Sequence, residues 1–355
     1  MVTLKTIADG IGDKHVVVGF DGFIDIILHA VDMRDGDRFT RIETITDFAN
    51  RIGSAAGRSS NIELVPRRKV VGGNGPILAG ALHNFGARVK SIGAFGEPMD
   101  DIFKDFAART QAVSIGSYGE TRAVEFSDGK IIFGELLSLS KVGVPDLLGK
   151  MSKEELVGLI DHCQAFALVN WTMMPHVSDI ARFFLGEILP ECSPGQRLFF
   201  FDLADPRKRK QSDLAEFLRD IRSFEQFGRS LLGLNVSEAQ QILRIVAENF
   251  TLLESAEELQ KAAEFLQKSL GLSVVFIHGN RISVAAAAGQ SALASGYFVE
   301  NPKFSTGAGD HYNAGFLAAY LCDGDINFAA NFAAATAAFY VKTGRSPELS
   351  DMEIF

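Results

Sequence analysis

Residues 301–320 read N-P-K-F-S-T-G-A-G-D-H-Y-N-A-G-F-L-A-A-Y and combine a glycine-rich turn with the start of a helix. After the turn, Phe316, Leu317 and Tyr320 recur at helical spacing. A glycine-rich turn that opens a helix presents unpaired backbone N–H groups at the positive end of the helix dipole. Phosphate commonly fills such a site, so the stretch predicts a phosphate-binding helix N-terminus.

Asp310 follows this turn directly. A carboxylate repels the phosphate that the backbone amides attract, so its presence here needs a chemical reason. One reason is general-base catalysis, in which the carboxylate takes a proton from a hydroxyl group that attacks phosphorus. The other is a simple helix cap, a position in which Asp is frequent. The residues alone leave both interpretations open.

The sequence T-G-A-G-D, followed by a helix that contains Asn-Ala-Gly-Phe-Leu, resembles the C-terminal signature of the ribokinase-like (PfkB) carbohydrate kinase family. The resemblance implies an ATP-dependent sugar kinase that uses Mg²⁺. It implies that Gly307, Ala308 and Gly309 form an anion hole, that Asp310 is the catalytic base, and that Thr306 lies at the nucleotide. The implied fold is α/β, a ribokinase-like three-layer α/β/α domain with a mainly parallel central sheet and a small β-rich lid.

A second glycine-rich stretch, V-V-G-G-N-G-P-I-L-A-G at residues 70–80, resembles the family's N-terminal signature. Gly72 and Gly73 allow backbone amides to approach a ligand closely, and we expect them, with Asn74, in the substrate site. The family usually has an Asn a few residues further on, where this chain has Pro-Ile-Leu at residues 76–78. This departure leaves the acceptor sugar open.

The run G-F-D-G-F-I-D at residues 19–25 follows the first predicted strand. In the family an Asp in this place binds sugar hydroxyls, which implies Asp25, with Asp21 as a rival. Either carboxylate could instead be a turn or cap residue. Asn170 ends another predicted strand, at residues 165–170, where open α/β sheets place their ligands, so we expect it in the substrate site as well.

Asn235 and Glu238 form an N-x-x-E pattern at the end of a predicted strand. From the residues alone, this is a helix N-cap with its capping-box acid. In the family the same pattern organises Mg²⁺ and its waters, and two oxygen-bearing side chains suit a hydrated Mg²⁺ ion. The resemblance further implies that Gly279 and Asn331 contact the nucleotide.

Strand and helix patterns alternate along most of the chain, which predicts a largely parallel sheet with helices on both faces. We expect a single domain over residues 1–355, with lid segments at about residues 24–70 and 117–138. Residues 32–69 fit either lid strands with an insertion or a helical excursion. Residues 117–133 fit a hairpin about an Asp-Gly turn, which is a lid hairpin by its position or an ordinary edge hairpin.

Composition excludes several classes of function. The chain has 355 residues, 47% of them hydrophobic, and a net charge of −9, which argues against a nucleic-acid-binding protein. No apolar run approaches the roughly 20 residues that a membrane helix needs. The three cysteines show no disulfide framework and no zinc pattern. We therefore expect a cytoplasmic protein. The family resemblance implies ATP and a small sugar as its partners, and it allows a homodimer formed through the lid.

Two alternatives remain from the sequence. One is a nucleoside kinase of the same fold. The other is a catalytically silent, ligand-binding member of the family. His311, which follows Asp310 where the family mostly has a small residue, and the departure at residues 76–78 favour the silent member, whereas the intact Asp310 argues against it.

Overall fold

The computed structural model describes residues 3–247, 255–297, 299–300, 303–304, 306–353. Two sheets account for the strands in these residues. The strands of the large sheet are β1 (His15–Phe20), β5 (Arg88–Ala94), β6 (Val113–Gly116), β9 (Ala165–Leu168), β10 (Arg197–Asp202), β11 (Gly228–Asn235), β12 (Val274–His278), β13 (Ile282–Ala287) and β14 (Gln290–Ser295). The strands of the small sheet are β2 (Phe23–Asp35), β3 (Arg38–Arg41), β4 (Leu64–Gly72), β7 (Gly119–Phe126) and β8 (Gly129–Glu135).

The large sheet has the strand order β14-β13-β12-β11-β10-β9-β1-β5-β6. Its strands from β12 to β6 pair in parallel, and β13 and β14 add an antiparallel edge. The parallel strands bring their C-terminal ends to one edge of the sheet, where ligands bind in open α/β folds.

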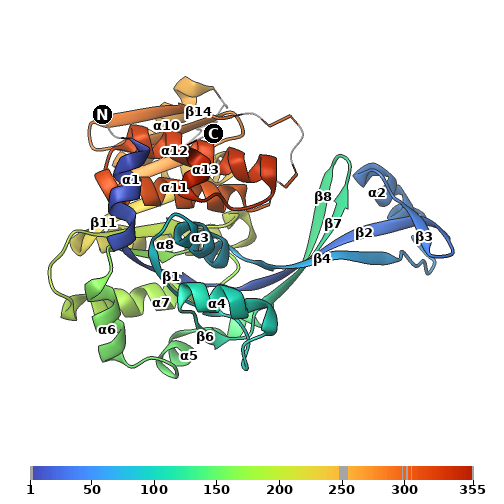
Figure 1. Cartoon of the computed structure of the whole chain (residues 1–355), viewed down its shortest axis with the longest axis horizontal. Helices are drawn as coiled ribbons and strands as arrows, with labels where there is room; N and C mark the ends of the chain where they lie inside the picture. Colours follow the sequence, from blue (N-terminus) through green and yellow to red (C-terminus); the bar gives the residue numbers. More distant parts are fainter. Residues whose placement is uncertain (1–2, 248–254, 298, 301–302, 305, 354–355) are drawn as a thin grey trace.

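With one exception, the α-helices cover the two faces of the large sheet. They are α1 (Leu4–Gly10), α2 (Ile45–Ser54), α3 (Asn74–Asn84), α4 (Lys104–Thr110), α5 (Val144–Leu148), α6 (Lys153–His162), α7 (Val177–Phe183), α8 (Gln211–Ser223), α9 (Val236–Val246), α10 (Ala256–Leu270), α11 (Ala308–Asp323), α12 (Ile326–Thr343) and α13 (Leu349–Met352). Helices α1, α3, α4, α11 and α12 share one hydrophobic core, and α6 to α10 share the other. Helix α2 belongs to the small sheet (Figure 1).

Strand β10 shows why the central strands are apolar on both faces. Its Phe199 and Phe201 side chains belong to one core, and Phe200, between them, belongs to the other. All three are fully buried. Side chains alternate across a strand, so a strand covered by helices on both faces must be apolar at every position.

The small sheet projects away from the large sheet (Figure 1) and is called the lid below, because its strands lie in the segments where the sequence predicts one. Its long strand β2 pairs with β7 in parallel and with β3 and β4 antiparallel, while β7 and β8 form a hairpin. Residues 32–69, for which the sequence allows strands or a helical excursion, contain β3, helix α2 and most of β4. Phe48 of α2 packs on Phe126 of β7 in a separate small core.

The predicted fold class is confirmed: a large, mostly parallel sheet lies between two helical layers, and a smaller sheet stands beside it. Among the residues with described positions, no helix has both the length and the apolar character needed to cross a membrane.

Candidate active site

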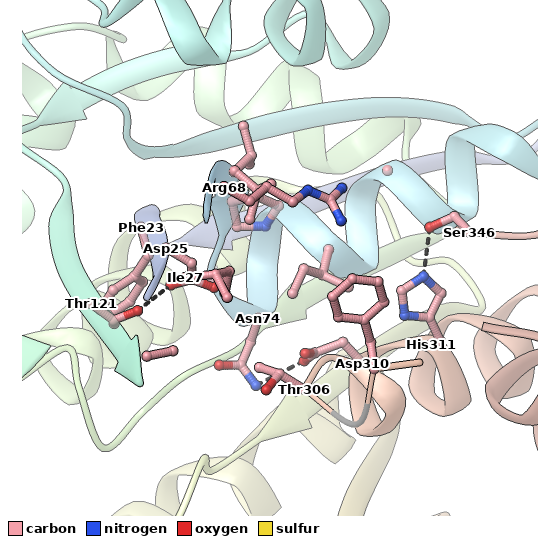
Figure 2. A pocket seen from close by; sticks show the side chains of 18 of the residues that line it. Phe23, Asp25, Ile27, Arg68, Asn74, Thr121, Thr306, Asp310, His311 and Ser346 are labelled. Carbon is pink, nitrogen blue, oxygen red and sulfur yellow. Dashed lines mark hydrogen bonds between the residues drawn. The ribbon is translucent and has the colours of Figure 1, made fainter. Parts of the chain in front are cut away.

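A pocket of about 860 Å³ lies between the lid and the edge of the large sheet (Figure 2). The lid contributes residues of β2, β4, β7 and β8 to its wall. The main body contributes residues of α3, α4, the first turn of α11 and the end of α12. Of the residues predicted from the sequence, the pocket brings together Asp25, Gly73, Asn74, Asn170, Thr306 and Asp310.

The glycine-rich turn opens helix α11 as the sequence predicts. Gly307 is the N-cap residue, with a φ angle of +85° that favours glycine. The backbone N–H groups of Gly307, Ala308 and Gly309 donate no hydrogen bond to a residue that the structure describes. A Cβ atom at Gly309 would lie 3.2 Å from Cε1 of His278, so this position leaves little room for a side chain. The turn therefore offers three N–H groups without an acceptor among the described residues next to Asp310, which suits a bound anion.

Asp310 lies in the first turn of α11 and points into the pocket (Figure 2). The side-chain amide of Asn74 donates a hydrogen bond to its Oδ1 atom at 2.8 Å. Burial raises the pKa of Asp310 well above its ordinary value, and the negative charges of Asp202 and Asp21 raise it further. A carboxyl group that accepts protons more readily than usual is suited to general-base chemistry.

Asp21 is buried beneath the pocket and does not form part of its wall. Its carboxylate accepts hydrogen bonds from the backbone N–H of Asn74 at 2.9 Å, from that of Gly75 at 2.7 Å and from the Asn170 side-chain amide at 2.6 Å. It therefore caps the N-terminus of α3. A Cβ atom at Gly73 or Gly75 would come within 2.8 or 2.6 Å of this carboxylate, so the turn needs both glycines.

Asp25 is the carboxylate of this pair that faces the pocket. It lies on β2, and the Thr121 hydroxyl on β7 donates a hydrogen bond to it at 2.6 Å (Figure 2). Burial raises the pKa of Asp25, although Thr121 and the nearby charge of Lys130 act against that shift. Gly72 lies against it, because a Cβ atom there would be 2.2 Å from Asp25 Oδ2. The backbone of the second glycine-rich turn thus lies directly against the carboxylates of Asp21 and Asp25.

Asn170 follows the end of β9 with a φ angle of +58°. Its amide nitrogen is bound to Asp21, and its buried Oδ1 atom has no partner among the residues described. Trp171, the next residue, points away from the pocket into the core. It is fully buried, stacks on Phe217 and donates its indole N–H to Ser178.

Asn235 and Glu238 form a complete capping box at the start of α9. Asn235 Oδ1 accepts the Glu238 N–H at 2.9 Å, and Glu238 Oε2 accepts the Asn235 N–H at 2.8 Å. The other oxygen of Glu238 accepts the N–H of Asp205 at 3.0 Å. Each oxygen keeps a free lone pair, which fits a water ligand of a metal ion. The described residues contain no group of three or more His, Cys, Asp and Glu side chains arranged to hold a metal directly.

The three predicted nucleotide contacts lie in different places. Thr306 lies in the pocket wall, and its carbonyl accepts the Tyr340 hydroxyl at 2.8 Å. Gly279 lies in the turn between β12 and β13, outside the pocket. Asn331 is exposed on α12 and donates its side-chain amide to the Asn327 carbonyl at 2.8 Å. Nothing in the structure tests whether these residues meet a nucleotide, so they stay predictions.

Sequence reasoning gave no role in the site to several residues of the pocket wall, among them Thr121, Lys130, His311 and Tyr340. Thr121 and Lys130 lie in a stretch whose alternating pattern predicts a hairpin. That pattern does not show which face of the hairpin lines a pocket. His311 stood out as an unusual neighbour of Asp310. Tyr340 gave no signal, because an aromatic residue near the end of an apolar helix is ordinarily a core residue.

Comparison with known proteins decides the family. The family model described as prokaryotic ketohexokinase matches residues 2–355. The chain belongs to this family. A ketohexokinase of Haloferax volcanii is 25% identical over 354 residues, which cover 99% of this chain and 93% of that protein. The prediction of a ribokinase-like carbohydrate kinase is therefore confirmed, and the chain is a sugar kinase.

Solved structures share the fold of this prokaryotic ketohexokinase family member. A ribokinase of Arabidopsis thaliana, solved with ribose and ATP, matches with a TM-score of 0.66 and 17% identity over 96% of this chain and 97% of that chain. An adenosine kinase of Sinorhizobium meliloti matches with a TM-score of 0.65 and 16% identity over 96% of this chain and 98% of that chain. At this identity, both matches concern the fold alone, so they do not separate sugar from nucleoside acceptors.

Proposed function

We propose that this chain transfers the γ-phosphoryl group of ATP to a hydroxyl group of a ketohexose, with Asp310 as the general base. The position of Asp310 carries the proposal: it lies in the pocket wall, beside three backbone N–H groups at the start of α11 that have no acceptor among the described residues. Asp25 lies in the same pocket, with Asn74 between the two carboxylates in Figure 2. The name of the family supports a ketohexose as the acceptor.

The reaction follows from these positions. Asn74 occupies Oδ1 of Asp310, which leaves Oδ2 to take the proton from the acceptor hydroxyl. The hydroxyl oxygen forms a bond to the γ-phosphorus as the bond to the leaving oxygen of ADP breaks. The amides of residues 307–309 donate to the phosphoryl oxygens, whose charge they stabilise during the transfer. Asp25 accepts hydrogen bonds from sugar hydroxyls and holds the acceptor in place.

We further propose that Asn235 and Glu238 hold Mg²⁺ through water molecules. The free lone pairs of the capping box fit this role, and Glu238 is close enough to Asp310 for its charge to raise the pKa of that group. When bound, the ion supplies positive charge that offsets the charge of the ATP phosphates.

A turnover assay with a panel of acceptors tests the proposal. MgATP is supplied with ketohexoses, aldohexoses, ribose, sugar phosphates and adenosine, and ADP release is coupled to a spectroscopic readout. We expect turnover with at least one ketohexose and at least about tenfold lower kcat/KM with the aldohexoses, because a pocket built for a set of hydroxyls discriminates against a changed pattern. Turnover with adenosine alone would identify the chain as a nucleoside kinase. Binding of ATP without turnover of any acceptor would favour the catalytically silent, ligand-binding member of the family.

The pH dependence of the reaction is expected to change when Asp202 is replaced. Asp310 must lose its proton before it can act as a base, so the rate falls as the pH falls through its pKa. The negative charge of Asp202 is one cause of the raised pKa of Asp310. In Asp202→Asn, the acidic limb of the pH profile of kcat/KM therefore moves to lower pH. An unchanged limb would contradict the coupling of the two carboxyl groups.

Two further expectations remain proposals. The free cysteines Cys163, Cys192 and Cys322 support the expected cytoplasmic location, since unpaired thiols are usual in a reducing compartment. Phe133 of β8 is about half exposed and lies on the lid, through which we propose that a homodimer forms.

A further inference from the structure

Two aromatic side chains stack on each other beside the glycine-rich turn of α11. The ring centroids of His311, on α11, and Tyr340, near the end of α12, lie 3.8 Å apart, with an angle of 13° between the ring planes. His311 is 2% exposed, although it contributes to the pocket wall. The proposed mechanism gives neither side chain a task.

Each ring is bound to one of two successive carbonyl groups of the turn. The Tyr340 hydroxyl donates to the carbonyl oxygen of Thr306 at 2.8 Å. The His311 Nδ1 atom lies 2.6 Å from the carbonyl oxygen of Gly307. A carbonyl oxygen can only accept, so Nδ1 of His311 carries the hydrogen. In the neutral ring, Nε2 then accepts from the Ser346 hydroxyl, which lies 2.5 Å away (Figure 2).

These two carbonyls belong to the same peptide units as two N–H groups of the anion hole. A peptide unit is planar and trans, so its C=O and N–H bonds point in opposite directions. Holding the carbonyl of Thr306 therefore fixes the direction of the Gly307 N–H. Holding the carbonyl of Gly307 fixes that of the Ala308 N–H in the same way. Gly307 has no side chain to restrict its own rotation, so the hydrogen bonds to the two carbonyls limit the movement of the turn.

We propose that His311 and Tyr340 are positioning residues that aim the N–H groups of Gly307 and Ala308 at the phosphoryl group. The inference rests on the proposed function, because it assigns these amides to the transferred phosphoryl group. It also explains why a bulky His follows Asp310 in this chain. His311 reaches back one helical turn to its own N-cap residue, and its backbone N–H also donates to the Gly307 carbonyl, at 3.0 Å.

Both groups keep the protonation state that this task needs. Burial lowers the pKa of His311 to about 4, so its ring stays neutral near neutral pH, with one donor and one acceptor nitrogen. Burial and the charge of Asp310 raise the pKa of Tyr340 to about 12, so its hydroxyl stays a donor. The pair therefore holds the turn in the same way across the pH range of a kinase assay.

The variant Tyr340→Phe tests the inference, because it removes the hydroxyl and keeps the ring that stacks on His311. We expect kcat to fall about tenfold, less than the loss caused by removing a donor of an anion hole outright, with little change in the KM values for ATP and sugar. Tyr320→Phe is the matched control, because Tyr320 is a buried tyrosine of α11 whose hydroxyl accepts from Arg229. Its kcat should equal that of the wild type.

Two variants of His311 separate the hydrogen bond from the packing. His311→Leu removes the donor to Gly307 and retains most of the volume, whereas Asn in its place offers a side-chain N–H close to the position of Nδ1. We expect His311→Leu to lower kcat about tenfold or more and His311→Asn to recover part of that loss. Equal losses in the two variants would assign His311 to packing and overturn its positioning role.

The wild type and Asp310→Asn are measured in the same assay, so that a failure of this inference can be distinguished from a failure of the proposed function. If the wild type turns over a ketohexose and Asp310→Asn does not, the proposed function stands, and an unchanged kcat in Tyr340→Phe overturns the inference. A raised KM with unchanged kcat overturns it as well, because that pattern marks ordinary contact with a substrate. If the wild type turns over no acceptor, the proposed function fails first, and with it the assignment of the amides on which the inference rests.

Discussion

Asp310→Asn is expected to lower kcat for the sugar by about a thousandfold, because an amide cannot take the proton from the attacking hydroxyl. The substitution keeps the shape of the side chain and an oxygen that can accept from Asn74, whose amide is bound to Asp310. Binding of ATP should be retained. Initial rates with the best ketohexose, together with ATP titration by calorimetry, provide the measurement.

The stability of Asp310→Asn serves as the control for a folding defect. The pKa of Asp310 is higher in the folded protein than in the unfolded chain, so ionisation of this carboxyl group costs stability. That cost is absent below the unfolded pKa and grows as the pH rises from there toward the folded pKa. The variant should therefore melt at the same or a higher temperature than the wild type at pH 8. A second control is Asp105→Asn, at an exposed residue of α4 in the same pocket wall, which should retain kcat. Full activity in Asp310→Asn would refute the assignment of the base.

Asp21→Ala and Asp25→Ala are expected to fail in different ways, although the two residues are four positions apart. Asp21 is buried and accepts three hydrogen bonds, so its loss leaves three donors without a partner. We expect Asp21→Ala to lose roughly 3 kcal/mol of stability and to melt several degrees lower. Asp25 faces the pocket, so Asp25→Ala should keep the melting temperature and raise the KM for sugar roughly tenfold or more.

Thermal melts and steady-state kinetics on both variants test this division. Asp21→Asn is the matched variant, because it has the same size but places an amide N–H against the donors of Asn74, Gly75 or Asn170. It should therefore also destabilise the protein. If Asp21→Ala were as stable as the wild type and lost only affinity for sugar, Asp21 would be the sugar ligand and the division would be wrong.

The regular elements could be read from the sequence because their signals are local. Helices α6 and α10 each begin after a Ser cap and have an apolar face, and both signals lie within a short stretch of sequence. The cap at Asn235 shows the limit of such signals. The capping box forms, and it stays compatible with a water-bound metal ion, so one sequence pattern satisfies both interpretations.

The contacts that build the site were beyond sequence reasoning, because they join distant parts of the chain. The hydrogen bond between Asn74 and Asp310 spans 236 positions, and the bond between Thr121 and Asp25 spans 96. The sequence placed Asp21 and Asp25 in one run but could not show which of them is buried. That distinction depends on where β1 ends and β2 turns toward the lid, a tertiary feature that no local pattern records.

The two carboxylates of the proposed reaction belong to different parts of the fold. Asp25 belongs to β2 of the small sheet, whereas Asp310 lies in the first turn of helix α11, which packs on the large sheet. In the proposed mechanism, recognition of the acceptor and chemistry on the phosphate are therefore assigned to separate elements, which the turn at residues 72–74 joins. An engineer could redesign the acceptor preference through β2, β7 and β8 and leave the phosphoryl-transfer machinery untouched. By the same logic, related enzymes would diverge in substrate first within the small sheet.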